Sequence, residues 1–460
     1  MEYWSLIAII LSLAALVILA LKGAKILFVA PLVAVIVAIL SGENGLAAFT
    51  ITYMKAFGNY IISNLPIFMT GALFGLLMDK SGNAQSLAKW VVNKLGEKRG
   101  LLTIVLATAI MVYGGVSLFV VAFTIYPIAA DVCRRANIPK RLIPGAIGLG
   151  AFGFAAYALP GSPQVQNAMF MPYYGTNLYA APVLGIIGAI IEFGLGMLWL
   201  NGRLKKAWAA GEGYGNHQEN LAKPDLEDTP SVLKAFSPIL LFLVLNLLFT
   251  YVVFPSMDLS YLETKYGTTA SAVTGTWSLV AALIISSILI ILLNLKKFRG
   301  QVLNLFGDGL GAAIVPITNT AAVIGYGGVI KSLAGFAIVS SLLMGISSNP
   351  LIAEVISVNV LSGITGSASG GIGITLDAFA DTFIEMAKAS GIRLEVMHRI
   401  GLIASAGLDS LPHNGAIITV LTVCGLTHKQ AYKDMFATTV VVPLICTAAL
   451  IILAMLGLQC

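Results

Sequence analysis

Long apolar runs alternate with short polar segments along almost the whole chain. A membrane-spanning helix needs about 20 mainly apolar residues. On that criterion the pattern predicts spans at residues 4–21, 26–40, 60–78, 142–175, 178–200, 236–254, 270–295, 311–330, 399–427 and 437–456. The fourth and ninth runs are too long for one straight helix, so we expect each of them to contain a break.

Two further apolar stretches, residues 101–130 and 351–386, have glycine-rich, polar centres. Glycine in the middle of an apolar segment favours a tight turn. Basic residues flank the first stretch on both sides, and the positive-inside rule places both flanks in the cytoplasm. We therefore expect each stretch to form a re-entrant hairpin that enters the membrane and leaves on the same side.

A polar segment at residues 201–235 is predicted to be a cytoplasmic linker between two comparable halves, residues 1–200 and 236–460. Each half offers three spans, a hairpin, a long interrupted span and a final span. This layout predicts an inverted repeat, which is common in secondary transporters. The expected fold is an all-α polytopic membrane protein with about ten transmembrane helices and two re-entrant hairpins.

The composition supports a membrane protein. Of 460 residues, 58% are hydrophobic and 10% are charged, whereas soluble domains carry roughly 25% charged residues. The net charge of +6 is distributed in short clusters between apolar runs, which predicts a setting in inner-membrane (plasma-membrane) lipid and argues against nucleic acid as a partner. The four cysteines have no CxxC spacing, so no metal site is indicated, and no motif indicates a cofactor.

The first interrupted span carries two prolines, Pro160 and Pro163, in the middle of the predicted membrane segment. Each proline removes a backbone donor and clashes with the preceding turn, so the helix should unwind there. The freed carbonyls and the side chains of Ser162, Gln164 and Asn167 then become candidates for binding a solute or a cation.

The second interrupted span contains Asp409, Ser410, Pro412, His413 and Asn414. Asp409 and Ser410 are suitable N-caps for a half-helix that resumes near Pro412. Ionisable groups inside a membrane segment also indicate function, which predicts proton coupling through Asp409 and His413. The alternatives are a simple helix cap for Asp409 and a structural role for His413. Ser410 and Asn414 are candidate contacts for the solute.

The two hairpin tips are candidates for binding an anion, because successive backbone N–H groups in glycine-rich turns attract negative charge. Alternatively, the glycines only permit close helix packing. The pattern places no arginine or lysine near mid-membrane, so hydroxyls and dipoles would have to hold a carboxylate. The candidate tip residues are Gly114, Gly115, Ser117, Thr365, Gly366, Ser367 and Ser369.

Three other polar positions are weaker candidates. Thr320 could line the site or simply pack in its span. Glu192 lies inside the fifth span, where it is expected to pair across an interface unless the span itself is shifted. Glu354 is expected towards the outer end of the second hairpin.

The stretches LPGSPQVQN at 159–167 and GLDSLPHNG at 407–415 resemble the gluconate permease (GntP) family of proton-linked symporters, within the larger ion transporter superfamily. The resemblance implies a scaffold domain, a moving transport domain that carries both hairpins, homodimers and an elevator-type cycle. Members carry sugar acids such as gluconate, hydroxy acids such as 3-hydroxybutyrate, or D-serine. The dicarboxylate branch has Ser-Asn-Thr tips, which this chain lacks, so sodium-coupled dicarboxylate transport is not expected.

The sequence therefore predicts a secondary active transporter, not an enzyme, that carries a small organic monocarboxylate together with a proton. Sodium-coupled symport is an alternative. An ion channel is less favoured: residues 323–327, VIGYG, resemble a potassium filter, but such filters need four copies around one pore. No HExxH or GxSxG motif indicates an enzyme.

Overall fold

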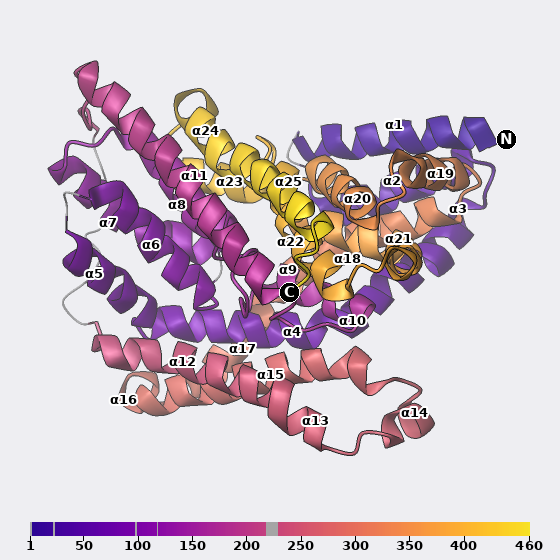
Figure 1. The fold of residues 1–460 in the computed structure, drawn as a ribbon, viewed down its shortest axis with the longest axis horizontal. Helices are drawn as coiled ribbons and strands as arrows, with labels where there is room; N and C mark the ends of the chain where they lie inside the picture. The colour runs from indigo at the N-terminus through magenta and orange to yellow at the C-terminus, as the bar shows by residue number, and fades with distance from the viewer. Residues whose placement is uncertain (1, 22–23, 97–98, 117, 218–228) are drawn as a thin grey trace.

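The computed structural model describes residues 2–21, 24–96, 99–116, 118–217 and 229–460. Every regular element among these residues is a helix (Figure 1). Six helical runs within them are long and apolar enough to cross a membrane: Gly45–Lys80, Pro182–Ala209, Val232–Ser256, Ala270–Leu293, Val302–Ser332 and His428–Met455. Shorter apolar helices accompany them. The predicted all-α, multi-pass membrane architecture is confirmed at this level.

One set of helices, the framework group, is built around the contact between α4 (Met54–Lys80) and α18 (Ile314–Ser332). The other members are α1 Glu2–Leu21, α2 Ile26–Leu40, α3 Gly45–Ala47, α12 Val232–Leu248, α13 Phe254–Ser256, α14 Tyr261–Tyr266, α15 Ala270–Leu293, α16 Leu295–Phe298 and α17 Val302–Ala312. Helix α2 packs on α18 and α15 packs on α4, while α1 packs on α2 and α12 on α15. In Figure 1, α12 and α15 lie below α4, whereas α1 lies at the top.

The second set of helices, the site group, contains both expected hairpins and both interrupted spans. Its members are α6 Gly100–Tyr113, α7 Leu118–Arg135, α8 Ile143–Phe152, α9 Val165–Met169, α10 Met171–Tyr174, α11 Pro182–Ala209, α20 Pro350–Thr365, α21 Ala368–Ser390, α22 Leu394–Asp409, α23 Gly415–Val423, α24 His428–Phe436 and α25 Val442–Met455. Helices α6 and α7 pack as a helical hairpin, and so do α20 and α21. Helix α8 lies along α6, and α22 lies along α20.

Local signals explain several helix ends. Pro350 occupies the first turn of α20, where its missing N–H costs little, and the Asn349 side chain accepts a bond from the Leu351 N–H. Thr427 and Gln430 form a reciprocal capping box at the start of α24. Helix α21 ends at Gly391, whose φ of 68° suits glycine best.

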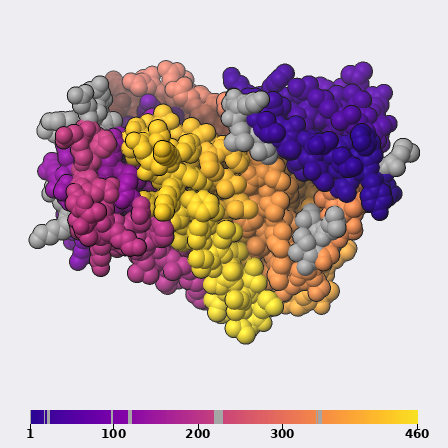
Figure 2. All heavy atoms as spheres, turned by 90° about the horizontal axis from the view of Figure 1, so that it is seen from above, coloured from indigo at the N-terminus to yellow at the C-terminus, as the bar shows by residue number. Residues whose placement is uncertain are grey.

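The packing partners in one half have counterparts in the other. Helices α4, α2, α1, α6 with α7, α8 and α11 correspond in order to α18, α15, α12, α20 with α21, α22 and α25. Helix α11 also packs against α25, the two final helices of the halves. Figure 2 shows the C-terminal residues, in yellow, lying between the magenta residues of the first half and the orange residues of the second. The repeat and its inverted orientation stay predictions.

Two short helices precede the hairpins and were not predicted from the sequence. They are α5 (Asn83–Leu95), which packs on α6 and α12, and α19 (Phe336–Ile346), which packs on α20 and α1. Helix α5 carries lysines and α19 has only 11 residues, so neither meets the criterion for a spanning segment. Their matching positions extend the correspondence between the halves.

Two predicted boundaries differ from the structure. The polar segment that was expected to begin as a linker at residue 201 continues α11 as far as Ala209. The span expected at 311–330 belongs to a longer run, Val302–Ser332, that is divided at Ala313. In both cases helix extends further into polar or glycine-rich sequence than expected, because packing overrides weak local preference.

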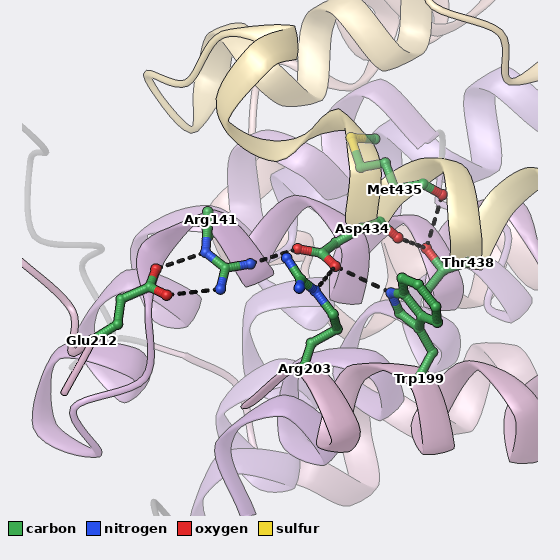
Figure 3. A network of polar contacts seen from close by, with 7 residues as sticks. All are labelled: Arg141, Trp199, Arg203, Glu212, Asp434, Met435 and Thr438. Carbon is green, nitrogen blue, oxygen red and sulfur yellow. Dashed lines mark hydrogen bonds and ion pairs between the residues drawn. The ribbon is translucent and has the colours of Figure 1, made fainter. Parts of the chain in front are cut away.

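A network of ion pairs, drawn in Figure 3, joins three segments at one end of the site group. Asp434 of α24 is 1% exposed. Its carboxylate accepts bonds from Arg141 at 2.9 Å, Arg203 at 2.7 Å and Trp199 at 3.1 Å. Arg141 also binds Glu212 through two parallel bonds of 2.6 and 2.8 Å. Every charge in this network therefore has an opposite charge within hydrogen-bonding distance.

Candidate functional site

The first interrupted segment, residues 153–164, joins α8 to α9 without helical structure. Its bend is completed by Gly161, which has a φ of 81° and donates its N–H to the Leu178 carbonyl at 3.0 Å. A Cβ atom at Gly161 would lie 2.7 Å from the Tyr179 ring, so the position needs glycine for both conformation and space. Pro160 and Pro163 on either side cannot donate to a helix.

The tip of the first hairpin docks onto this interrupted segment. The Tyr113 hydroxyl donates to the Pro160 carbonyl at 2.8 Å, and the Gln164 amide donates to the Val112 carbonyl at 2.7 Å. Gly115 has a φ of 79°, and a Cβ there would lie 2.9 Å from Phe74 of α4. Gly114 ends α6 against the Ile239 side chain of α12. Ser117, the predicted hydroxyl of this tip, lies outside the described residues.

The second interrupted segment joins α22, which ends at Asp409, to α23, which begins at Gly415. The Asn414 side chain caps α23 by accepting from the N–H groups of Ala416 at 2.7 Å and Ile417 at 3.0 Å. The prediction that Asp409 and Ser410 cap a half-helix beginning near Pro412 is therefore wrong. Asparagine is as good an N-cap as aspartate or serine, and the chain turns for several residues before helix resumes.

Asp409 is buried and faces the start of the second hairpin's outgoing helix. Its carboxylate accepts from the Ser410 hydroxyl at 2.7 Å and interacts with the backbone N–H of Ala368. The N-terminal end of α21 therefore lies against this carboxylate, where the helix dipole favours negative charge. The Ser410 carbonyl in turn accepts from the Tyr432 hydroxyl at 2.9 Å.

The tip of the second hairpin is bound to the second interrupted segment. Asn414 donates through Nδ2 to the Gly366 carbonyl at 3.0 Å and to the Asp409 carbonyl at 2.9 Å. Gly366 has a φ of 61°, and a Cβ there would lie 2.7 Å from the His413 ring. His413 Nε2 is buried without a hydrogen-bond partner among the described residues.

The hydroxyls of the second tip bond mostly within the hairpin. The Ser367 side chain accepts from the Gly370 N–H at 3.2 Å and caps α21. The Thr365 hydroxyl donates to the Leu361 carbonyl at 2.8 Å. Ser369 is buried in the first turn of α21. These hydroxyls shape the turn, so backbone groups rather than free hydroxyls face the neighbouring segment.

The two interrupted segments use asparagine in the same way. Asn167 donates through Nδ2 to the carbonyl of Ser162, five positions earlier, at 2.9 Å. Asn414 donates to the carbonyl of Asp409, also five positions earlier, at 2.9 Å. Each asparagine also bonds a second carbonyl, from Leu178 or Gly366. Each amide thus replaces helical bonds that the interruption removes.

Two adjacent residues of α22 were missed as site residues from the sequence. His398 Nε2 lies 2.9 Å from Asn167 Oδ1, and His398 Nδ1 lies 2.7 Å from the Thr176 hydroxyl. Because the Asn167 amide nitrogen is already donating, its oxygen must accept, and the ring therefore carries its hydrogen on Nε2. His398 fixes Asn167, which in turn fixes the first interrupted segment.

Arg399 binds the same region directly. Its guanidinium donates to the carbonyls of Ala180 at 2.8 Å, Leu178 at 2.9 Å and Tyr157 at 3.1 Å. The side chain is 0% exposed, and the ion pairs found among the described residues do not include it. The sequence did not indicate that Arg399, at the start of an apolar run, is buried within the protein.

Comparison with known proteins decides what kind of molecule this is. The model of the GntP family permeases matches residues 4–456. A transporter of Bacillus subtilis (strain 168), YxjC, is 40% identical over 470 aligned positions, covering 98% of this chain and 99% of that protein. The chain belongs to the GntP permease family.

More distant likenesses agree with this assignment. A transporter of Haemophilus influenzae is 36% identical over 130 residues, or 28% of this chain. The crystal structure of the Alcanivorax borkumensis YdaH transporter, described as having an unusual topology, covers 90% of both chains with a TM-score of 0.59 and 16% identity. At that identity the likeness concerns the fold alone. A permease is a transporter, not an enzyme, which confirms that prediction.

This GntP family permease also contains two buried glutamates with no cation beside them in the described residues. Glu354 of α20 accepts from the Tyr174 hydroxyl at 2.6 Å, and its other oxygen has no partner there. Both carboxylate oxygens of Glu192 in α11 lack hydrogen-bond partners there. Glu354 lies near the start of α20, away from the hairpin tip, and is fully buried. Glu192 does not form the expected pair among these residues.

Thr320 of α18 lies at the junction between the framework and site groups of the permease. It is buried, and its hydroxyl donates to the Pro316 carbonyl at 3.1 Å within its own helix. It also lies beside the Tyr60 hydroxyl of α4, which in turn lies 3.6 Å from the Met169 sulfur of α9. Thr320 therefore belongs to the contact on which the site group rests.

Proposed function

We propose that this permease is a proton-coupled symporter of a small organic monocarboxylate, such as gluconate, 3-hydroxybutyrate or a similar hydroxy acid. One observation carries the proposal: the buried guanidinium of Arg399 binds three carbonyls and has no carboxylate partner among the described residues. An isolated charge in a low-dielectric interior is costly. A solute carboxylate in the same region supplies the missing negative charge.

The solute would bind between the two hairpin tips and the two interrupted segments. Each tip is bonded to the interrupted segment of its own half, through Gln164 in the first and Asn414 in the second. Arg399 and His398 then link α22, which leads into the second segment, to the first segment. These contacts join the first segment to α22 ten residues before that helix ends at Asp409. Ser162, whose buried hydroxyl lacks a partner among the described residues, is a candidate contact.

Asp409 gives a physical reason for coupling to a proton. Its carboxylate occupies the N-terminal end of α21, a place that also suits a solute anion. Protonation of Asp409 removes its charge and frees those donors, so proton binding and anion binding favour each other. His413, with its unpartnered Nε2 beside Gly366, is the second candidate for the coupling proton.

The same geometry favours a proton over sodium. A sodium site needs several oxygen ligands, and the interrupted segments would have to provide carbonyls. The carbonyls of Tyr157, Pro160, Ser162, Leu178 and Ala180 already accept bonds from Arg399, Tyr113 and Asn167. Sodium-coupled symport is therefore the second candidate function.

The family resemblance carries three further parts of the proposal. The framework group is the candidate scaffold and the site group the candidate moving domain of an elevator-type cycle. The scaffold would form a homodimer within the inner membrane. Support comes from the two-group packing, in which α4 and α18 meet the site group mainly at α9 and α21.

The proposal is tested by uptake of labelled gluconate or 3-hydroxybutyrate into proteoliposomes with an inward proton gradient, an inward sodium gradient or neither. We expect accumulation only with the proton gradient. Asp409→Asn and His413→Ala should each reduce that accumulation, whereas Asp381→Asn, which alters an exposed acid of α21, should not. Full accumulation by well-folded Asp409→Asn and His413→Ala proteins contradicts the assignment of the proton to these residues. Uptake that follows sodium alone contradicts proton coupling and favours the sodium-coupled alternative.

A further inference from the structure

We propose that Glu192 of α11 is a second proton-binding residue of the permease, placed against the first residue of the first interrupted segment. This inference rests on the proposed proton-coupled function and adds a proton site outside the tips and interrupted segments. It begins from the position of Glu192, which is 0% exposed and has no hydrogen-bond partner at either carboxylate oxygen among the described residues.

The groups that face Glu192 offer no positive charge. From α25, the Cys446 thiol lies beside the carboxylate and donates to the Gly188 carbonyl, one turn earlier in α11, at 3.5 Å. From the interrupted segment, Tyr157 lies close enough to interact electrostatically. Helix α22 presents Arg399 to α11 at Gly185, two turns away from Glu192. Helices α6 and α8 and the stretch Ala437–Val441 add no ionisable side chain near Glu192.

The end of α8 makes a negative charge at this position still less favourable. A Cβ at Gly153, the residue after α8, would lie 3.3 Å from Glu192 Oε2 and 2.8 Å from the Leu149 carbonyl oxygen. The carboxyl group therefore lies at the C-terminal end of α8, where unpaired carbonyls carry partial negative charge. A neutral carboxylic acid can donate to such a carbonyl, whereas a carboxylate is repelled. Glu192 thus holds a proton in this conformation.

Glu192 lies next to the site through Gly153, which is the first residue of the first interrupted segment. Loss of the proton to water would leave a carboxylate beside the carbonyls at the end of α8. That charge would weaken the packing of α11 on α8 and α25.

The test compares two transport modes of Glu192→Gln in proteoliposomes, since glutamine resembles the protonated acid but cannot release a proton. We expect exchange of internal for external 3-hydroxybutyrate, which needs no net proton movement, to continue. We expect accumulation driven by a proton gradient to fall at least about tenfold, or about 1.4 kcal/mol. Glu192→Asp should retain both modes, and Glu385→Gln, at an exposed position of α21, serves as the matched control.

Unchanged accumulation by Glu192→Gln overturns the proposal, as does equal loss of exchange and accumulation in a protein whose melting temperature matches the wild type. Failure of the proposed function can be told apart from failure of the Glu192 proposal, because in the first case the wild type itself would show no proton-driven uptake. If the glutamine variant does not fold, the wild type is treated with a hydrophobic carbodiimide, which reacts with protonated carboxyls in apolar surroundings. Peptide mass spectrometry should then find the label on Glu192, and an unlabelled Glu192 beside other labelled carboxyls overturns the proposal.

Discussion

Two regions of the permease differ in whether their charged side chains form ion pairs. At the junction of α11 and α24, Asp434 and Glu212 are matched by Arg141 and Arg203, with every bond between 2.6 and 2.9 Å. Around the interrupted segments, Arg399, Asp409 and Glu192 are buried and belong to no ion pair among the described residues. Both regions contain buried charges that are expensive to remove from water.

We propose that this difference separates the charges that hold the fold together from those that take part in transport. A paired carboxylate with several donors is satisfied in one arrangement of helices, so it stabilises that arrangement. A buried charge without an ion pair can be neutralised only by a species that binds to it, such as a proton or a solute anion. We expect substitutions of the paired charges to change stability and substitutions of the unpaired charges to change transport.

The largest effect is expected from Arg399→Gln. The change leaves three buried carbonyls without their charged donor, and bonds to charged groups contribute roughly 1.5–3 kcal/mol each. We expect the transport efficiency for the solute to fall by roughly 100-fold or more, equivalent to about 2.7 kcal/mol. Arg399→Lys keeps the charge but not the three-carbonyl geometry, so it should be intermediate.

The matched control for that series is Arg393→Gln, at an exposed arginine just before α22. Initial rates of uptake at several solute concentrations, divided by the amount of folded protein in the vesicles, provide the measurement. An Arg399→Gln permease that folds and transports within about twofold of the wild type contradicts the role given to this charge.

The next effect is expected from Asp434→Asn and should fall on stability. Breaking a buried ion pair costs about 3–5 kcal/mol, and the partial exposure of both arginines places this site at or below the lower end. We expect a clearly lower melting temperature in detergent, with unchanged transport per folded molecule. A variant that melts normally but transports poorly would place this network in the transport machinery and reverse the comparison.

A smaller effect is expected at Asn414, where two substitutions separate two bonds. Asn414→Asp keeps the oxygen that caps α23 but loses the donor to Gly366 and Asp409. Asn414→Ala loses both, and removal of an N-cap costs about 1 kcal/mol. We expect both variants to weaken solute binding about tenfold and to lower the melting temperature, the alanine variant more, because it loses the cap as well as the two donor bonds. Equal melting temperatures for the two variants would show that the cap contributes nothing.

The smallest effect concerns Glu212, whose pKa is lowered by its hydrogen bonds to Arg141. A lowered folded-state pKa stabilises the protein above the pKa of the unfolded chain, about 4.3. That stabilisation is lost as the pH falls below this value through the folded-state pKa. The melting temperature of Glu212→Gln should therefore differ slightly from the wild type at pH 6 and approach it below about pH 4. A difference that stays constant over that range contradicts a charge-dependent contribution.

The fold was predictable where it depends on local features of the sequence, namely the length of an apolar run and the helix-breaking residues within it. Apolar runs predicted most of the long helices, and Pro160, Gly161 and Pro163 predicted non-helical backbone where residues 153–164 have it. The short helices α5 and α19 were not predictable by length. The end of the second interruption was misplaced, because Asn414 rather than Asp409 caps the following helix.

The site was predictable only in part, because its key contacts join distant segments. Asn167 was identified from its place beside the prolines, but its partner His398 is 231 positions away. Arg399 lies next to His398 at the start of an apolar run, and nothing local shows that its three acceptors lie around residues 157–180. The adjacent His-Arg pair leading into an apolar span was the available signal.

The central claim is that the interior of the permease carries a positive charge that a solute carboxylate neutralises. The most direct measurement compares the thermal stabilisation of purified wild-type protein by 3-hydroxybutyrate or gluconate with that by the corresponding uncharged amides. A ligand that binds the folded state raises the melting temperature with its concentration. We expect a concentration-dependent rise with at least one of the acids and none with its amide. Equal stabilisation by an acid and its amide would contradict it.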